Sequence, residues 1–131
     1  ADIGKVFQAP VRKDVFLSNQ KKTTFFLLVM PEEKAFDTAS FSKKLGVSHM
    51  SFASPEHMWE HLGTKPGSAS VVGLLNDEDD YVQLIIDKEV AEAEYFVCNT
   101  GINTTHLKFK TQDLLKKFLP YTHHRPRIVD L

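Results

Sequence analysis

The residues of this chain that are best suited to chemistry lie in the stretch PGSASVVGLLND, residues 66–77. Gly67, Ser68, Ala69 and Ser70 run without a break into an apolar segment. Small side chains leave backbone N–H groups uncovered, so these groups can donate to a carbonyl oxygen or to an oxyanion. The stretch does not match the phosphate-binding glycine motifs, because no Lys-Ser/Thr pair follows its glycine. Taken alone, it favours a plain tight turn, with a backbone oxyanion site as the alternative.

Other residues with metal-binding or nucleophilic side chains give weaker patterns. His57 and His61 stand four residues apart in a predicted helix, a spacing that two metal ligands use, but no third ligand stands nearby in the sequence. The adjacent His123 and His124 are more typical of a surface. Cys98 has no charged sequence neighbour that would mark a nucleophile, and its strand predicts a buried thiol. We therefore expect neither a metal nor a cofactor.

Length and composition predict a single globular domain over residues 1–131. Hydrophobic residues make up 42% of the chain and charged residues 25%, which is ordinary for a soluble protein. The longest wholly apolar stretch, residues 25–30, is far too short to cross a membrane. No leader sequence precedes it and Cys98 is the only cysteine, so we expect a reducing compartment and a cytoplasmic location.

Charge is nearly balanced overall but unevenly distributed. A net charge of −1 argues against a general binder of polyanions. Acidic residues gather at 76–94, where the segment 76–80 lacks the glycine and final Glu of a calcium loop and is expected to be a solvated turn. Basic residues form an N-terminal cluster (Arg12, Lys13, Lys21 and Lys22) and a C-terminal cluster (Lys108, Lys110, Lys116, Lys117, Arg125 and Arg127). The two clusters either meet in an anion-binding patch or are solvated surface charge.

The first half of the chain predicts a β-hairpin followed by two short helices. Residues 15–17 and 23–30 are the strands, with a polar turn at 19–22, and Pro31 ends the second strand. Residues 38–45 have helical spacing and end at Gly46, which is suited to a left-handed cap. After a strand at 47–52, Ser54 caps a helix that has Pro55 at its first position and ends at Gly63.

The second half predicts two further strand pairs and one helix. A second hairpin is expected from residues 71–75 and 81–86 around the acidic turn, and strands at 95–98 and 104–109 flank a polar loop. Thr111 is expected to cap a helix over 112–119 that Pro120 ends, with a last edge strand at 128–129. Together these elements predict an α+β domain whose mixed, mostly antiparallel sheet has short helices packed on it.

Five stretches, taken in order, resemble the YbaK/prolyl-tRNA synthetase-associated editing domain family. They are KDVFL (13–17), HMSFAS (49–54), LGTKPGSASVVGLLND (62–77), VQLIIDKEV (82–90), and NTGINTT with TQDLLKKFL (99–119). The final RPRIVDL also has the look of the family. No single motif is decisive, but their order and spacing run through nearly the whole chain. Within the family, the chain is most similar to the freestanding PrdX/ProX branch, which deacylates Ala-tRNA(Pro).

The resemblance implies the fold of that family and an aminoacyl-tRNA hydrolase that needs no cofactor. The small-residue loop would wall the pocket for the aminoacyl group, and Lys13 would anchor the 3′ end of the tRNA. The implied catalytic residues are Lys13, Gly67, Ser68 and Asn99, and the implied substrate-binding residues are Asp14, Ala69, Ser70, Val71, Gly73, Asn103 and Thr104. The implied partners are the acceptor end of a tRNA, tRNA(Pro) first, and prolyl-tRNA synthetase, whereas neither DNA nor a membrane is expected.

Three residues depart from the pattern of the family. Asp14 stands where the family has Asn, and Val71 stands where a Pro usually follows the glycine loop. Asn99 takes the place of a His, and an amide can donate and accept hydrogen bonds but cannot titrate. The chain also begins close to the lysine motif, without the helical segment that commonly precedes it in the family.

Two functions from different classes follow from these residues. The first is a trans-editing deacylase in which a water molecule, assisted by the substrate's own ribose hydroxyl, attacks the aminoacyl ester. The alternative is a non-catalytic tRNA-binding module of the same fold, in which the three departures have removed the chemistry. A small-ligand α+β domain unrelated to tRNA is a third interpretation.

Overall fold

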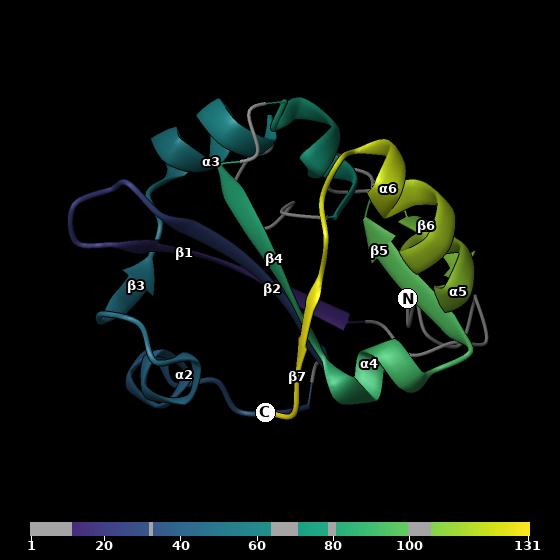
Figure 1. Cartoon of the computed structure of the whole chain (residues 1–131), viewed down its shortest axis with the longest axis horizontal. Coiled ribbons are helices and arrows are strands. Elements are labelled where there is room, and N and C mark those ends of the chain that lie inside the picture. Colours follow the sequence, from purple (N-terminus) through teal and green to yellow (C-terminus); the bar gives the residue numbers. More distant parts are fainter. Residues whose placement is uncertain (1–11, 32, 64–70, 79–80, 100–105) are drawn as a thin grey trace.

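The computed structural model describes residues 12–31, 33–63, 71–78, 81–99 and 106–131 (Figure 1). Within these ranges a five-stranded sheet has the order β3 (Met50–Phe52), β1 (Arg12–Asn19), β2 (Phe25–Pro31), β4 (Val82–Asp87) and β7 (Arg127–Val129). β1 is antiparallel to both of its neighbours, whereas β4 is parallel to β2 and to β7. β5 (Tyr95–Asn99) and β6 (His106–Lys110) form a separate antiparallel pair. The predicted α+β class with a mixed sheet is confirmed.

The predicted hairpin of β1 and β2 is confirmed, and its turn is built by one side chain. Asn19 Oδ1 accepts hydrogen bonds from the backbone N–H groups of Thr23 and Thr24, at 2.9 and 3.1 Å. Lys22 adopts the left-handed backbone conformation, with φ of 59°. The amide oxygen of Asn19 therefore satisfies two backbone N–H groups of the turn.

The second predicted hairpin is wrong. Residues 71–75 are not a strand but part of a 3-10 helix, η1 (Val71–Asn76), and β4 pairs in parallel with β2. Gly73 lies against Leu62, where an added Cβ would be 2.9 Å from the Leu62 carbonyl oxygen, and Asn76 Nδ2 donates to the same oxygen at 2.8 Å. Periodicity alone does not separate a short apolar run in a strand from one in a helix, so contacts with the preceding helix decided the conformation.

Both predicted helices of the first half are confirmed, together with the predicted caps Gly46, Ser54 and Gly63. α2 (Thr38–Leu45) begins after Asp37, whose carboxylate accepts from the N–H groups of its first turn, and ends at Gly46 with φ of 68°. α3 (Pro55–Leu62) begins after Ser54, whose hydroxyl accepts from the N–H of His57, and ends at Gly63 with φ of 65°. The predicted strand at 47–52 is shorter in the structure, where β3 starts at Met50.

The last helix differs from the prediction at both ends. It is made of α5 (Thr111–Asp113), the π-helical η2 (Leu114–Phe118) and α6 (Leu119–Tyr121), so Pro120 lies inside its final turn. Thr111 is the first helical residue rather than a side-chain cap, and its buried hydroxyl has no partner among the described residues. Pro120 has no backbone N–H to donate, and the turn just before α6 is π-helical. A short helix that the sequence did not suggest, α4 (Lys88–Glu92), starts after Asp87.

The side chains of the sheet alternate between two hydrophobic cores, one on each face. The large core comprises Phe16, Phe25, Leu27, Val29, Leu62, Val71, Leu74, Val82, Leu84, Ile86, Val90, Ala91, Phe96, Leu114 and Leu119. The small core, which α2 covers, comprises Leu17, Phe26, Leu28, Met30, Phe41, Leu45, Met50 and Ile85. None of the helices in the described ranges has the length and apolar character needed to cross a bilayer.

Candidate functional site

Lys13 and Asp14, adjacent residues of the KDVFL motif, lie on opposite faces of the sheet. Lys13 of β1 is paired with Met30 of β2, and Met30 belongs to the small core. Asp14 is paired with Val29, which belongs to the large core. Directly opposed residues of an antiparallel pair share a face, so the two charged side chains point away from each other. They do not form a single cluster.

Lys13 is held by the segment that follows β2. Its ammonium group donates to the backbone carbonyl of Lys34. Lys34 in turn contacts Asp87 Oδ2 at 3.0 Å and donates to the carbonyl of Leu131 at 3.2 Å. The hydrogen bond to Asp87 raises the pKa of Lys34. An ammonium group has three donors, so the contact with one carbonyl leaves Lys13 able to bind an anion as well.

Asp14 is the most unusual ionisable residue of the described sheet. The residue is partly exposed, but its Oδ1 is buried and has no hydrogen-bond partner among the described residues. Burial raises the pKa of the Asp14 carboxyl to about 8. A carboxyl in such surroundings is kept largely protonated near neutral pH unless a cation approaches it.

The flanks of the small-residue loop lie on the same face as Asp14. Leu62 and Val71, the nearest described core residues on either side of 64–70, both belong to the large core. Gly73 is buried against Leu62 by its close approach to the Leu62 carbonyl. The predicted residues Gly67, Ser68, Ala69, Ser70, Asn103 and Thr104 lie outside the described residues.

β5 completes the arrangement around the large core. It contacts β1, and Asn99 is its last residue, paired with His106 of β6. The side chains of Asn99 and Cys98 lie outside the described part, so the predictions for both stay predictions. The structure thus brings the elements that carry Asp14, Val71, Gly73 and Asn99 to one face. Lys13 alone among the described predicted residues points to the other.

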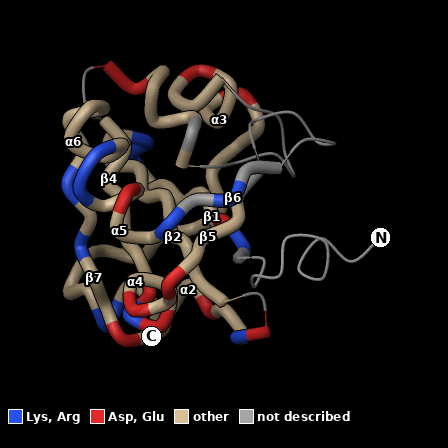
Figure 2. Tube along the Cα trace, turned by 90° about the vertical axis from the view of Figure 1, so that its right-hand side faces the viewer, with Lys and Arg blue, Asp and Glu red and all other residues tan. Residues whose placement is uncertain are grey.

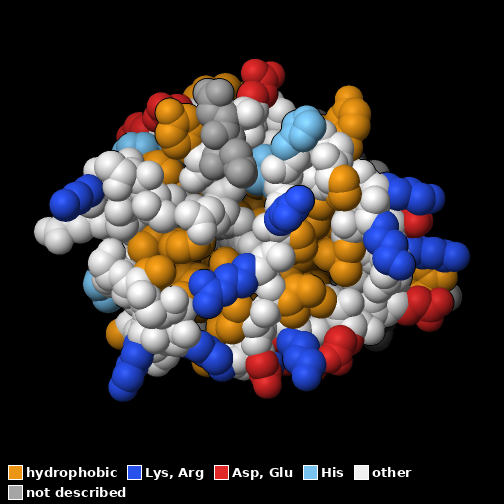
Figure 3. Space-filling view, in the orientation of Figure 1, with side chains coloured by type: hydrophobic (Ala, Val, Ile, Leu, Met, Phe, Trp, Pro, Cys, Tyr) orange, Lys and Arg blue, Asp and Glu red, His pale blue; other side chains and the backbone are white. Residues whose placement is uncertain are grey.

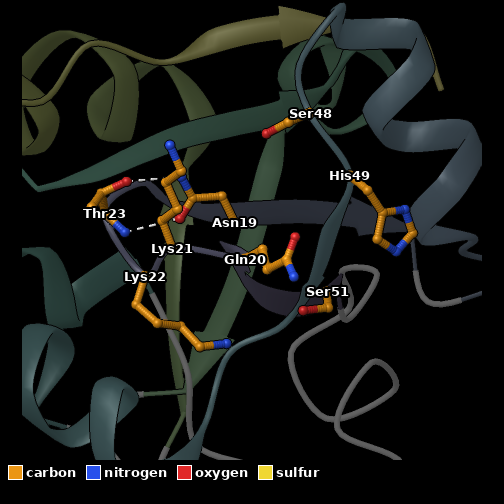
Figure 4. A pocket seen from close by; sticks show the side chains of 8 residues that line it. All are labelled: Asn19, Gln20, Lys21, Lys22, Thr23, Ser48, His49 and Ser51. Atoms are coloured by element: carbon orange, nitrogen blue, oxygen red, sulfur yellow. Dashed lines mark hydrogen bonds between the residues drawn. The ribbon is translucent and has the colours of Figure 1, made fainter.

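A polar pocket at the tip of the β1–β2 hairpin was missed by sequence reasoning. Its volume is about 740 Å³, and it is lined by Asn19, Gln20, Lys21, Lys22, Thr23, Ser48, His49 and Ser51 (Figure 4). Two lysines beside a histidine suit an anionic group such as a phosphate. The paired lysines of the turn were a visible signal in the sequence, but nothing marked His49 as their neighbour. None of the predicted site residues that the structure describes lines this pocket.

The N-terminal basic cluster is divided between the two ends of β1. Lys13 and the Lys21–Lys22 turn stand at opposite ends of β1, about 20 Å apart at the rise of an extended strand. Arg125 and Arg127 line a different pocket, of about 280 Å³, beside β4. Figure 2 shows Lys and Arg residues along β7 and beside α6, and Figure 3 shows them spread over that face rather than gathered. Lys21 and Lys22 on the one hand, and Arg125 and Arg127 on the other, therefore line separate pockets in the described part of the chain.

Two predictions about polar surface residues are also wrong. Asp77, expected in a solvated turn, is buried, and so is His124, expected at the surface. Oδ2 of Asp77 lies 2.9 Å from Nε2 of His124. The Asp77 carboxylate also accepts from the N–H groups of Tyr81 and Val82, at 3.0 and 2.7 Å, which positions the start of β4. The pair has a structural role, because it joins the last segment of the chain to the centre of the sheet.

The two histidines of α3 pack as aromatic rings. His57 and His61 stack with their centroids 6.4 Å apart, and both contact the ring of Phe25, at 5.3 and 4.3 Å. Within the described ranges no group of three or more His, Cys, Asp or Glu side chains is arranged to hold a metal ion. Through these ring contacts both histidines pack over the large core.

A family model agrees with these elements over most of the chain. The model described as the aminoacyl-tRNA editing domain matches residues 2–117. These residues include β1 with Lys13 and Asp14, the small-residue loop with its flanks, and β5 with Asn99.

Two relatives and one solved structure extend the comparison. The prolyl-tRNA editing protein ProX of Acetoanaerobium sticklandii is 27% identical over 104 residues, which cover 79% of this chain and 63% of ProX. The prolyl-tRNA synthetase associated domain-containing protein 1 of Bos taurus is 26% identical over 122 residues, covering 90% of this chain and 70% of that protein. A crystal structure of a candidate trans-editing enzyme for prolyl tRNA synthetase has a TM-score of 0.73 at 14% identity, covering 98% of this chain and 76% of the other. This chain therefore spans less than two thirds of the length of ProX, and the structural likeness bears on the fold alone.

Proposed function

Because the chain belongs to the aminoacyl-tRNA editing domain family, we propose that it hydrolyses the ester bond of a mischarged tRNA, with Ala-tRNA(Pro) as its substrate. The family match over residues 2–117 carries this proposal. The relatives named for prolyl-tRNA editing and for association with prolyl-tRNA synthetase support tRNA(Pro) as the tRNA. The partner is then the acceptor end of that tRNA, with prolyl-tRNA synthetase as the enzyme whose errors are removed.

Such an editing step compensates for a physical limit on how well the synthetase can select its amino acid. A binding pocket made for proline excludes the smaller alanine by only about 1–3 kcal/mol for each missing methylene group. Misacylated tRNA is therefore produced at a rate that binding alone cannot suppress. A separate site that admits alanine and excludes proline corrects the error.

The reaction needs an oriented water molecule and stabilisation of the charge that develops on the carbonyl oxygen. In the proposed mechanism the backbone N–H groups of Gly67 and Ser68 polarise the carbonyl, and the 2′-hydroxyl of the terminal ribose assists the attacking water. Asn99, Asn103 and Thr104 line the site. Lys13 points to the opposite face of the sheet, and its proposed role as the anchor of the terminal phosphate rests on the family resemblance alone. The placement of Leu62 and Val71 in the large core supports this scheme, because it fixes both ends of the loop beside one face of the sheet.

Selectivity for alanine follows from the small side chains of the pocket wall. Gly67, Ser68, Ala69 and Ser70, backed by Val71, leave room for an alanyl group. A prolyl ring would push the backbone aside, and overpacking of this kind costs about 1–3 kcal/mol. Correctly charged tRNA(Pro) is thereby protected from hydrolysis.

The proposal is tested with a panel of tRNAs charged with alanine, serine, glycine or proline, supplied at equal concentration. We expect rapid release of alanine, slower release of serine and glycine, and no release of proline. Rapid release of proline would contradict an editing role.

A non-catalytic tRNA-binding module is the second candidate, and one observation favours it. The carboxyl of Asp14 replaces an amide of the family pattern and is buried without a partner among the described residues. A chain that has lost its chemistry would bind uncharged and mischarged tRNA(Pro) equally and release no amino acid from either. Filter binding with both tRNAs, run beside the hydrolysis panel, separates the two candidates.

A further inference from the structure

Asp14 combines three properties that are rarely found together in a carboxyl group of a sheet. It lies on the face of the large core, opposite Val29, and its Oδ1 is buried without a hydrogen-bond partner among the described residues. The residue as a whole is partly exposed, so its side chain meets solvent through atoms other than Oδ1. A buried oxygen that accepts no hydrogen bond lowers stability, and a ligand that donates to it recovers this loss.

No cation in the described part of the chain neutralises Asp14. The lysine beside it in sequence, Lys13, points to the small core and donates to the Lys34 carbonyl. The lysine of that segment, Lys34, is engaged by Asp87 instead. The carboxyl of Asp14 is therefore an acceptor without a donor in the described part of the chain. It lies on the same face as the flanks of the small-residue loop.

The chemistry of the ligand follows from these contacts. A phosphate offers no hydrogen-bond donor at neutral pH and would leave Oδ1 without a partner, so Asp14 is unsuited to the tRNA backbone. An aminoacyl ester carries one cationic group close to the ester, the α-ammonium of the amino acid, and this group has three N–H donors. A charge-assisted hydrogen bond between ammonium and carboxylate is among the stronger polar contacts in proteins.

We propose that Asp14 receives the α-ammonium group of the aminoacyl ester on its carboxylate and thereby positions the ester carbonyl for hydrolysis. This inference rests on the proposed function, since it assigns one part of the proposed substrate to one residue. Asn at the same position would accept a hydrogen bond without charge, so the replacement by Asp strengthens recognition of a free amino group. Asp14 is a specificity-determining residue in this scheme rather than a residue that attacks the ester.

The state of the free protein agrees with this assignment. Burial raises the pKa of Asp14 to about 8, so near neutral pH the carboxyl holds a proton until a cation arrives. Binding of the ammonium group favours the carboxylate, and the displaced proton leaves to solvent. The protein thus avoids holding an unpaired buried charge while its site is empty.

The test compares two substrates that differ only at the amino group. They are Ala-tRNA(Pro) and lactyl-tRNA(Pro), in which a hydroxyl replaces the ammonium group at nearly the same size. We expect the wild-type preference for the alanyl ester to fall by roughly ten- to a hundredfold in Asp14→Asn, because one charge-assisted hydrogen bond is lost. The ratio of the two hydrolysis rates, alanyl over lactyl, is compared between the wild type and Asp14→Asn. The intrinsic difference in reactivity between the two esters then cancels. Asp113→Asn, which changes an exposed carboxylate paired with Lys117, is the matched control and should keep the wild-type ratio.

A binding measurement separates this inference from the proposed function. The probe is 3′-alanylamino-3′-deoxyadenosine, an amide that cannot be hydrolysed as the ester is, compared with its lactyl counterpart. Preference for the alanyl amide that is lost in Asp14→Asn supports the inference even if no tRNA is hydrolysed, in which case only the proposed function fails. Hydrolysis of Ala-tRNA(Pro) with an unchanged ratio in Asp14→Asn would overturn the inference and leave the function standing. Equal binding of both amides by the wild type would also overturn it.

Discussion

The side chains of Asp77 and His124 form a buried pair, with Oδ2 of Asp77 2.9 Å from Nε2 of His124. The other ring nitrogen of His124, Nδ1, lies 2.8 Å from the carbonyl oxygen of Thr122, which can only accept a hydrogen bond. Both ring nitrogens of His124 therefore face oxygen atoms, which fixes the orientation of the ring. The pair joins the segment before β4 to the segment before β7, which are far apart in the sequence.

The buried pair predicts a large loss of stability on substitution. His124→Ala leaves the buried Asp77 carboxylate with one hydrogen-bond partner fewer, and leaving such a buried group partly unsatisfied costs about 1–3 kcal/mol. The free energy of unfolding, measured in urea, should fall by that amount. The neighbouring His123 is exposed with φ of 62°, so His123→Asn, which tolerates the left-handed conformation, is the control and should be nearly silent. Equal stability of the two variants would show that the pair contributes little.

Gly73 is expected to be required for packing. A Cβ at this position would lie 2.9 Å from the carbonyl oxygen of Leu62, and a backbone atom cannot move aside as a flexible side chain would. Gly73→Ala should therefore lower the free energy of unfolding by about 1–3 kcal/mol. Gly46→Asn is the control, because Gly46 has open space around it and Asn adopts its left-handed conformation. Loss of deacylation at unchanged stability would instead identify Gly73 as a substrate contact.

Lys13 is expected to contribute to tRNA recognition while making only a small contribution to folding. A charge-assisted contact with a phosphate contributes about 1.5–3 kcal/mol, so Lys13→Ala should lower deacylation or tRNA binding by about ten- to a hundredfold. The lost contact with the Lys34 carbonyl should cost about 1 kcal/mol of stability. Lys88→Ala, which removes an exposed lysine paired with Glu92, is the control. An active Lys13→Ala variant with normal tRNA affinity would remove Lys13 from the proposed site.

Because the pKa of Asp14 is raised, we expect the free energy of unfolding to fall as the pH rises. Its folded-state pKa of about 8 lies above the ordinary value of 3.8, so between these values the folded chain holds a proton that the unfolded chain has released. The contribution is fully present below pH 3.8 and is lost as the pH rises through 8, with a slope of at most about 1.4 kcal/mol per pH unit. Thermal unfolding of the wild type and of Asp14→Asn between pH 5 and 9 measures this pH-dependent contribution, because an Asn side chain does not titrate. Parallel stability profiles would contradict the raised pKa.

The elements that were predicted correctly depend on local chemistry. Ser54 and Pro55 determine where α3 begins, Gly46 and Gly63 determine where two helices end, and Asn19 builds its own turn. Each of these residues acts on backbone groups within a few positions along the chain. A single sequence therefore contains enough information to place them.

The elements that were predicted wrongly depend on contacts between distant segments. The conformation of η1 follows from the packing of Gly73 against Leu62, and the burial of Asp77 follows from a histidine that stands 47 residues later. The opposite directions of Lys13 and Asp14 follow from alternation along a strand, but which face holds which core is a tertiary property. Motif resemblance identified the residues of the candidate site, whereas only the fold shows that Asp14 rather than Lys13 shares a face with the flanks of the loop.

The parallel pairing of β4 has a consequence for how the chain folds. The β1–β2 hairpin closes a short turn, but β2 and β4 are joined by residues 32–81, and β4 and β7 by residues 88–126. Closing long connections before their contacts form is slow, so we expect the hairpin to form early and β4 to dock late. The small-residue loop belongs to the first of these connections. Its two flanks, Leu62 and Val71, can be buried together only when β4 has joined the sheet, so the proposed pocket wall is assembled among the last steps of folding.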